Sequence, residues 1–375
     1  MDVPPFKLKS IMFEHLKSSS LMGLCFSDGE RWSWQEIVDH ADEESRGLCE
    51  RAMKEKVMSS PLLQREIASQ YDSLQSENIG LFGGAQESGY HVMRTLLNPG
   101  DHVIVVTPCY QFLKEIPKMC GADVLEFPLQ REENFKLNGE RLKKAIRPNT
   151  KLMVLNYPHN PTGVDLSLRE KKEIIDLAEA HGIYVLNDEI YRGLEFNENS
   201  RSPSIADLYE RGIVITSLSK VFGLPTLRVG WVASQDKTVI KGAAALRSYT
   251  SSRNSELSEL FAFMVLRGKN ELLARNRAII LKNYALLSQF FDRHQQSLSC
   301  EPPQAGTMAF PKLLLPIPID KFVAELHQET SVFILSGSAF DLNDNSFRIT
   351  FGKKEMAHSL THLEHFLKIK SKGNI

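Results

Sequence analysis

Two short apolar runs, Lys151-Leu-Met-Val-Leu-Asn156 and Ile183-Tyr-Val-Leu-Asn-Asp188, decide the fold of this chain. Each run is almost continuously apolar, as is typical of strands that are buried on both faces of a sheet. The segment between them has helical periodicity. Ser167-Leu-Arg-Glu170 has the form of a capping box, and Gly182 stands where a helix is expected to end. A strand, a helix and a second strand in this order predict a parallel sheet flanked by helices.

Similar apolar runs at residues 102–107 and 213–218 extend this predicted sheet. From about residue 75, short β-branched runs alternate with amphipathic segments, which is the pattern of an α/β protein. Residues 236–295 are mostly helical in pattern, whereas 296–375 mix short strands and helices. We therefore predict a large α/β domain over 46–260, and a small α+β domain formed by 1–45 together with 261–375.

The composition excludes several classes of protein. The chain has 375 residues, of which 42% are hydrophobic and 24% are charged, as in an ordinary globular protein of two domains. A formal net charge of -1 provides no general attraction to nucleic acid or to an anionic membrane. No apolar run approaches the ~20 residues of a membrane-spanning helix, and the first residues lack the pattern of a signal peptide.

The cysteines indicate a reducing environment. There are five of them, an odd number, and none forms a C-x-x-C pair. Free thiols in the cytoplasm are therefore expected, rather than disulfides or a zinc site. The histidines at positions 159, 181, 358, 362 and 365 also lack the spacing of metal ligands, so we expect no metal site.

Polar residues follow the predicted strands, at the edge of the sheet where α/β proteins bind ligands. Asn160 follows the run at 151–156, Asp188 ends the run at 183–188, and Lys220 follows the run at 213–218. Each of these segments alone is typical of a turn or a helix cap. Their order and spacing carry the signal, because the aspartate lies 28 residues after the asparagine and the lysine 32 residues after the aspartate.

Together with a glycine turn at Gly83-Gly-Ala-Gln86, these segments resemble the aminotransferase class I and II family, which uses pyridoxal 5'-phosphate (PLP). The resemblance extends from about Glu77 to Gly352. Its most specific part is Ser217-x-Ser-Lys-x-Phe-Gly-Leu-Pro-x-Leu-Arg-x-Gly-Trp231. It implies an α/β fold of type I, with a large domain built on a mostly parallel sheet flanked by helices, plus a smaller α+β domain.

The resemblance implies a role around the cofactor for each matched residue. Lys220 would form the internal aldimine and, once displaced by substrate, would act as a general base or acid. Asp188 would pair with the protonated pyridine nitrogen. Asn160 and Tyr191 would donate hydrogen bonds to the 3'-oxygen of the ring, and Tyr110 would stack on the ring.

The resemblance also implies two anion sites. Free N–H groups at the start of a helix and two side chains would bind the phosphate, and these ligands are Gly84, Ala85, Gln86, Ser217 and Arg228. The glycine-rich stretch lacks the G-x-G-x-x-G spacing of a dinucleotide site. Arg348, with Asn160 beside it, would hold the substrate α-carboxylate through two parallel hydrogen bonds, so an amino acid substrate is expected.

The chain departs from the family pattern before the glycine turn. The family has a tyrosine that reaches the phosphate of the partner subunit, followed by a glycine five residues later, and residues 54–65 contain neither. Tyr71 falls after the helix start, so that role is not transferred to it. The N-terminal arm lacks the usual glycine beside the substrate, and Ser336 stands where a proline is common. Arg253 lies where the family places a segment facing the neighbouring active site, and is either a side-chain selector or a simple exposed arginine.

The predicted function is transfer of the amino group of an L-amino acid to a 2-oxo acid by a PLP-dependent, cytoplasmic homodimer. One alternative is a lyase or cyclase of the same fold, which the altered stretch at 54–65 favours. A second alternative is a regulator that keeps the fold for binding alone. The absence of a helix-turn-helix pattern and of a basic patch in the first 45 residues argues against that regulator.

Overall fold

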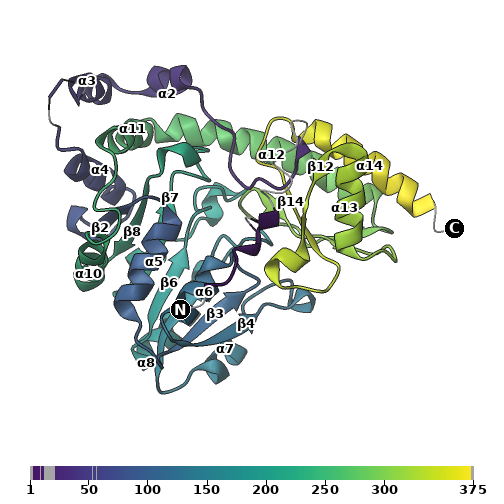
Figure 1. Ribbon diagram of the computed structural model, residues 1–375, viewed down its shortest axis with the longest axis horizontal. Coiled ribbons are helices and arrows are strands. Elements are labelled where there is room, and N and C mark those ends of the chain that lie inside the picture. The colour runs from purple at the N-terminus through teal and green to yellow at the C-terminus, as the bar shows by residue number, and fades with distance from the viewer. Residues whose placement is uncertain (1–2, 9, 12–21, 53, 56, 373–375) are drawn as a thin grey trace.

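The computed structural model describes residues 3–8, 10–11, 22–52, 54–55 and 57–372 (Figure 1). Its centre is a seven-stranded sheet with the order β2-β8-β7-β6-β5-β3-β4. The strands are β2 (Ile79–Phe82), β3 (His102–Thr107), β4 (Asp123–Pro128), β5 (Thr150–Leu155), β6 (Tyr184–Asp188), β7 (Gly212–Ser217) and β8 (Gly230–Ser234). All neighbours from β7 to β4 are parallel, whereas β8 is antiparallel to both β7 and β2. The predicted α/β class with a mostly parallel sheet is confirmed.

The two faces of this sheet bury separate apolar cores. Along β3, Val103 and Val105 belong to one cluster, while Ile104 and Val106 belong to the other. The first cluster contains residues of α5 (Ala85–Leu96), α6 (Phe112–Met119) and α10 (Lys237–Arg247). The second contains residues of α7 (Gly139–Ala145), α8 (Leu168–His181) and α9 (Ile205–Leu208). Since each strand has apolar side chains on both faces, its polar residues are confined to its ends.

Helix α8 has the ends that its sequence predicts. The Ser167 hydroxyl accepts a hydrogen bond from the Glu170 backbone at 3.3 Å, and the Glu170 carboxylate accepts one from the Ser167 backbone at 2.8 Å. Gly182 ends the helix in the left-handed region, with φ of 66°. The capping box and the glycine stop are both confirmed, and they set where β6 begins.

The C-terminal third forms smaller sheets and long helices. It contains α11 (Glu256–Arg267), α12 (Lys269–Arg293), β9 (Leu298–Ser299), β10 (Met308–Ala309), β11 (Lys312–Leu313), α13 (Ile319–Thr330), β12 (Val332–Phe333), β13 (Leu335–Ser336), β14 (Phe347–Thr350) and α14 (Met356–Lys372). Strands β10, β14 and β13 pair antiparallel in that order. Among the described helices, none is both long and apolar enough to cross a membrane.

The N-terminal stretch packs on both parts of the molecule. Strand β1 (Met22–Gly23) pairs in parallel with β12, and α2 (Trp34–His40), α3 (Glu43–Ala52) and α4 (Ser59–Ala68) pack against α11. Residues 12–21 of the predicted small domain lie outside the described residues. The domain boundaries at residues 46 and 260 stay a prediction.

Residues 24–29, here called the N-terminal segment, connect the C-terminal elements to the loop that carries Lys220. Backbone hydrogen bonds join Leu24 to Phe333 at 3.0 Å and Gly29 to the Lys220 carbonyl at 2.8 Å. Thr307 donates to the Ser27 carbonyl at 2.8 Å. Figure 1 shows this purple stretch passing between the central sheet and the yellow C-terminal elements. The segment is therefore held at both ends and in its middle.

Gly223 provides a test of this packing. Its φ is +65°, and a Cβ built on it would lie 2.1 Å from the Glu30 carbonyl oxygen, which is backbone and cannot move away cheaply. We expect Gly223→Ala to lower the free energy of unfolding by about 2 kcal/mol or more. Gly47 lies inside α3, and none of the described residues has an atom packed within 4 Å of its would-be Cβ. Gly47→Ala should therefore raise the free energy of unfolding by up to about 1 kcal/mol.

Urea denaturation of the two variants and the wild-type protein measures both effects. Equal stability of Gly223→Ala and the wild-type protein would contradict the packing described for this loop.

Candidate active site

A cavity of about 180 Å³ lies where β5, β6 and β7 end, and the N-terminal segment borders it. Nine of the predicted site residues line it: Ala85, Gln86, Tyr110, Asn160, Asp188, Tyr191, Ser217, Lys220 and Arg228. The other two lie directly behind this lining. Gly84 precedes Ala85 in the glycine turn, and Arg348 contacts Asn160. The structure thus brings together residues that are up to 264 positions apart, from Gly84 to Arg348.

Strand register explains why these residues meet. Leu155 of β5 pairs with Asn187 of β6, and Asp188 pairs with Ile215 of β7, so the three strands end at nearly the same level. The Asn156 side chain then links two of the loops. It donates to the Asp188 carbonyl at 2.8 Å and accepts from the Asn160 backbone at 3.1 Å.

Asp188 is a deeply buried carboxyl group, with only 4% of its surface exposed. One carboxyl oxygen accepts a hydrogen bond from the Ile190 backbone at 3.2 Å. Burial raises the pKa of Asp188 to about 7, because it penalises the charged form more than this hydrogen bond and the Lys220 charge favour it. A cation placed beside this carboxyl would restore its charge. The carboxyl therefore suits a protonated ring nitrogen.

Lys220 forms an ion pair in the wall of the cavity. Its Nζ donates to Asp28 Oδ1 at 2.6 Å and to the Ser27 hydroxyl at 3.0 Å. The same hydroxyl accepts from the Tyr191 hydroxyl at 2.9 Å. Burial lowers the pKa of Lys220, but the Asp28 carboxylate and two tyrosines outweigh it, and the net pKa lies above its ordinary value. Burial raises the pKa of Asp28, but Lys220 outweighs it, and the net pKa lies below its ordinary value.

The start of α5 forms a cradle for an anion. Gly84 precedes the helix with φ of +116°, and the first N–H groups of a helix have no partners within the helix. Arg228 crosses this turn and donates from Nη2 to the Gly83 carbonyl at 2.8 Å. A Cβ built on Gly84 would lie 2.6 Å from that nitrogen, so a side chain there would fill the cradle.

Arg348 is a buried guanidinium on β14, with 2% of its surface exposed. Nη1 donates to Asn160 Oδ1 at 2.9 Å, Nη2 donates to the Cys25 carbonyl at 2.7 Å, and the group lies 5.4 Å from the centre of the Phe340 ring. Its Nε is buried and has no hydrogen-bond partner among the described residues. Because an unpaired buried donor is costly, this arginine is prepared for an acceptor such as a carboxylate.

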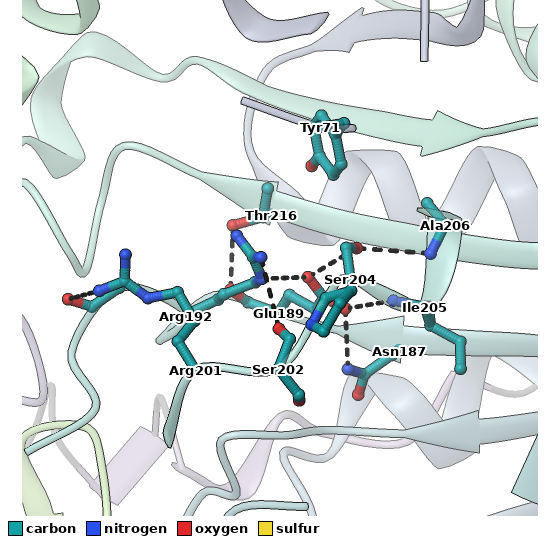
Figure 2. Close-up of polar contacts among 12 residues, drawn as sticks. Tyr71, Asn187, Glu189, Arg192, Arg201, Ser202, Ser204, Ile205, Ala206 and Thr216 are labelled. Carbon is teal, nitrogen blue, oxygen red and sulfur yellow. Dashed lines mark hydrogen bonds and ion pairs between the residues drawn. The ribbon is translucent and has the colours of Figure 1, made fainter. Parts of the chain in front are cut away.

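A second cluster, of buried polar and charged groups, lies next to the cavity and is centred on Glu189, the residue after Asp188. The Glu189 carboxylate accepts from the Ser204 hydroxyl at 2.9 Å and from the Ile205 backbone at 3.1 Å, and Arg192 Nε lies 3.4 Å from it. Figure 2 shows Glu189 between Arg192 on one side and Ser204 and Ile205 on the other. These contacts fix the backbone that carries Asp188, so the cluster supports the site from behind.

Tyr71 belongs to this rear cluster and not to the main cavity. It lines a separate pocket of about 50 Å³ together with Glu189, Arg192 and Trp231. Its hydroxyl accepts from the indole nitrogen of Trp231 at 3.0 Å. Arg253 is exposed and is not among the residues that line the main cavity. Within the described residues of this one chain, neither side chain completes the site.

Ser27 and Asp28 also line the cavity, and the sequence analysis did not predict them as site residues. Their partners, Tyr191 and Lys220, lie 164 and 192 residues away along the chain. No local pattern signals such a contact.

The chain belongs to the aminotransferase class I and II family, whose model matches residues 54–363. The aspartate aminotransferase of Pyrococcus horikoshii is 27% identical over 307 residues, which cover 78% of this chain and 76% of that protein. A PLP-dependent aminotransferase from Streptococcus suis has a TM-score of 0.92 and 29% identity over 98% of both chains. The PLP-dependent cyclase OrfR has a TM-score of 0.88 and 25% identity over 99% of this chain and 98% of that one.

The protein is accordingly a PLP-dependent enzyme of this family, and its residues fit that cofactor. The cradle at Gly84 and Arg228 suits the phosphate group. At other points of the same cavity, the Asp188 carboxyl suits a cationic ring nitrogen, and Lys220 provides a primary amine.

The cradle can be tested through cofactor binding. Because an added methyl group displaces the Arg228 guanidinium, we expect Gly84→Ala to weaken PLP binding about tenfold or more. Fluorescence titration of the cofactor-free protein with PLP measures the dissociation constant. Gly139→Ala is a matched control, since no atom lies within 4 Å of its would-be Cβ, and an equal loss in both variants would contradict the assignment.

Proposed function

We propose that this enzyme is an aminotransferase that moves the amino group of an L-amino acid to a 2-oxo acid, with Lys220 attached covalently to the cofactor. One observation carries the proposal. A single cavity combines a primary amine, a buried carboxyl and the anion cradle, and a buried arginine with an unpaired N–H lies beside it. These groups suit an amino acid on one side and PLP on the other.

When bound, PLP supplies an electron sink that stabilises negative charge on the substrate α-carbon. Asp188 would maintain that capacity by stabilising a positive charge at the ring nitrogen. Asn160 would donate a hydrogen bond to the ring oxygen, and Tyr191 would do the same once its hydroxyl turns away from Ser27, while Tyr110 would pack against the ring face. The backbone of the glycine turn and two side chains would hold the phosphate, and these ligands are Gly84, Ala85, Gln86, Ser217 and Arg228.

Lys220 has two tasks in this proposal. Its nitrogen would hold the cofactor and would be freed when an amino acid takes its place. The freed amine would move a proton at the substrate α-carbon, acting first as a base and then as an acid. The position of Lys220 in the cavity lining, just after the end of β7, supports both tasks.

Arg348 orients the substrate for that proton transfer. Its planar guanidinium can donate two parallel hydrogen bonds to an α-carboxylate, with Asn160 beside it. Holding the carboxylate fixes the α-carbon relative to Lys220, which favours the reaction through orientation.

A cyclase of the same fold is a second candidate function. The similarity to OrfR over nearly the whole chain favours it. Such an enzyme would release its product without consuming an acceptor, whereas an aminotransferase needs an oxo acid for each further turnover. Dependence on an acceptor therefore separates the two candidates.

The purified holoenzyme should convert at least one amino acid to its 2-oxo acid, with multiple turnovers only when an acceptor oxo acid is supplied. Mass spectrometry of both products measures this. Multiple turnovers without an acceptor would overturn the proposal and favour the lyase or cyclase.

Borohydride reduces the bond between the cofactor and a lysine and so leaves a permanent tag on the peptide. In Lys220→Ala this treatment should leave no tagged peptide spanning residue 220, whereas the exposed control Lys237→Ala should retain the tag.

Arg348→Lys should weaken amino acid binding about tenfold or more, because a lysine cannot reproduce two parallel hydrogen bonds. The cofactor content should stay unchanged, since the arginine lies outside the phosphate cradle. Spectral titration of the holoenzyme with an amino acid measures the binding. Arg293→Lys, at an exposed ion pair with Glu364, is the control and should bind as the wild type does.

Two further proposals concern assembly and location. Exposed apolar side chains lie on or beside helix α11 and two of the helices that pack on it, α2 and α4, and include Trp34, Met58 and Leu257. They support a homodimer, because exposed apolar patches mark association surfaces.

The five cysteines are all free, which supports a reducing cytoplasmic location.

A further inference from the structure

Ser27 and Asp28 are two polar groups of the active site to which the proposed reaction assigns no role. The Ser27 hydroxyl and one Asp28 oxygen converge on the Lys220 ammonium at 3.0 Å and 2.6 Å. The hydroxyl is oriented by Tyr191, and the segment is fixed by the backbone bonds described above. Lys353 Nζ also holds the Gly29 carbonyl at 2.5 Å. The two groups are therefore a preorganised receptor for a primary ammonium group.

We propose that Ser27 and Asp28 form the ammonium subsite of this enzyme: they hold the free Lys220 ammonium, and they hold the α-ammonium of the incoming amino acid when Lys220 is attached to the cofactor. The second half of this proposal rests on the proposed function. The occupant of the subsite is in each case a protonated primary amine, and the two occupants alternate.

The neighbouring carboxylate subsite supports this assignment. Arg348 is bound to the carbonyl of Cys25, which lies two residues before Ser27 in the same segment. A chain advances at most roughly 3.6 Å per residue, so the Cα atoms of Cys25 and Ser27 lie within about 7 Å of each other and the two subsites are adjacent along the segment. A free amino acid carries its carboxylate and its ammonium on one carbon, which matches a pair of adjacent subsites of opposite charge.

Charge balance explains why the partner of Asp28 must change. Attachment to the cofactor takes N–H donors away from Lys220, and a partly buried carboxylate without its partner is costly. The incoming ammonium replaces those donors. The other titratable and charged groups that face this ion pair are Cys25, Arg31, Tyr110, Asp188, Tyr191, Arg348 and Lys353. They remain in place in an Asp28 variant, so a comparison with the wild type isolates the contribution of Asp28.

The first test needs no amino acid. The absorbance of the bound cofactor changes when the nitrogen that it shares with Lys220 loses its proton. Because the Asp28 carboxylate stabilises the positive charge on that nitrogen, Asp28→Asn should lower the pH midpoint of this change by about one unit or more. Asp28→Glu keeps a carboxylate and should have a pH midpoint close to that of the wild type. Asp39→Asn, which removes an exposed carboxylate of α2, should leave the midpoint unchanged.

The second test separates the two subsites by ligand. An amino acid without an α-hydrogen, such as 2-methylnorleucine, binds without turnover, and hexanoate has the carboxylate without the ammonium. Asp28→Asn should weaken binding of the amino acid about tenfold or more, while hexanoate binds as well as before or better. Arg348→Lys should weaken both ligands. Spectral titration or calorimetry of the holoenzyme measures each dissociation constant.

The outcomes distinguish this inference from the proposed function. An unchanged pH midpoint in Asp28→Asn, or an equal loss of amino acid and hexanoate binding, overturns the ammonium subsite. If no amino acid alters the wild-type spectrum, the proposed function fails and the substrate half of the subsite fails with it. In that case the pH titration still decides whether the Asp28 carboxylate acts on the Lys220 nitrogen. Cofactor content and circular dichroism, matched to the wild type, establish that each variant is folded.

Discussion

The arrangement of the site depends on one constraint, which is that parallel strands in register end at a single edge of their sheet. Inside the sheet, β5, β6 and β7 have apolar side chains on both faces, and a polar group there would lack partners. Polar side chains are therefore confined to the strand ends, where Asn156, Asp188 and Ser217 come together. The cavity and the chemistry around it follow from that confinement.

The remaining half of the site is assembled from segments far apart in sequence, and buried charge binds them together. Arg348 on β14 is held by Asn160 and by the Cys25 carbonyl, so one guanidinium connects three separate regions of the chain. Lys220 and Asp28 connect the end of the sheet to the N-terminal segment in the same way. Removing one partner from such a pair leaves an uncompensated charge, which is strongly destabilising when buried. The Arg348 guanidinium thus helps to hold three separate regions of the chain together.

Sequence reasoning predicted what local patterns encode and missed what depends on distant contacts. The strands at 102–107, 151–156, 183–188 and 213–218 were predicted to within one residue, because each is a continuous apolar run. Strand β2 was missed because it has only four residues and contains Gly80, and β8 because it has only five residues and begins with Gly230. The cavity positions of Lys220 and Asp188 followed from their places at strand ends. Asp28 could not be placed, because its position depends on hydrogen bonds that join the Gly29 backbone to the Lys220 carbonyl and to the Lys353 side chain.

The way the N-terminal segment is held has a consequence for the chemistry that the fold can support. Its placement comes from main-chain groups, since the carbonyls of Leu24, Ser27 and Gly29 all accept hydrogen bonds from elsewhere in the protein. The side chains of residues 27 and 28 contribute nothing to those carbonyl contacts and point to the cavity lining instead. Other side chains at these two positions would leave those main-chain contacts in place. The backbone of the segment and the side chains that face the cavity are thus largely independent of each other. The likeness of this chain to both an aminotransferase and a cyclase is consistent with this, because the outcome of a reaction depends on a few side chains and not on the fold.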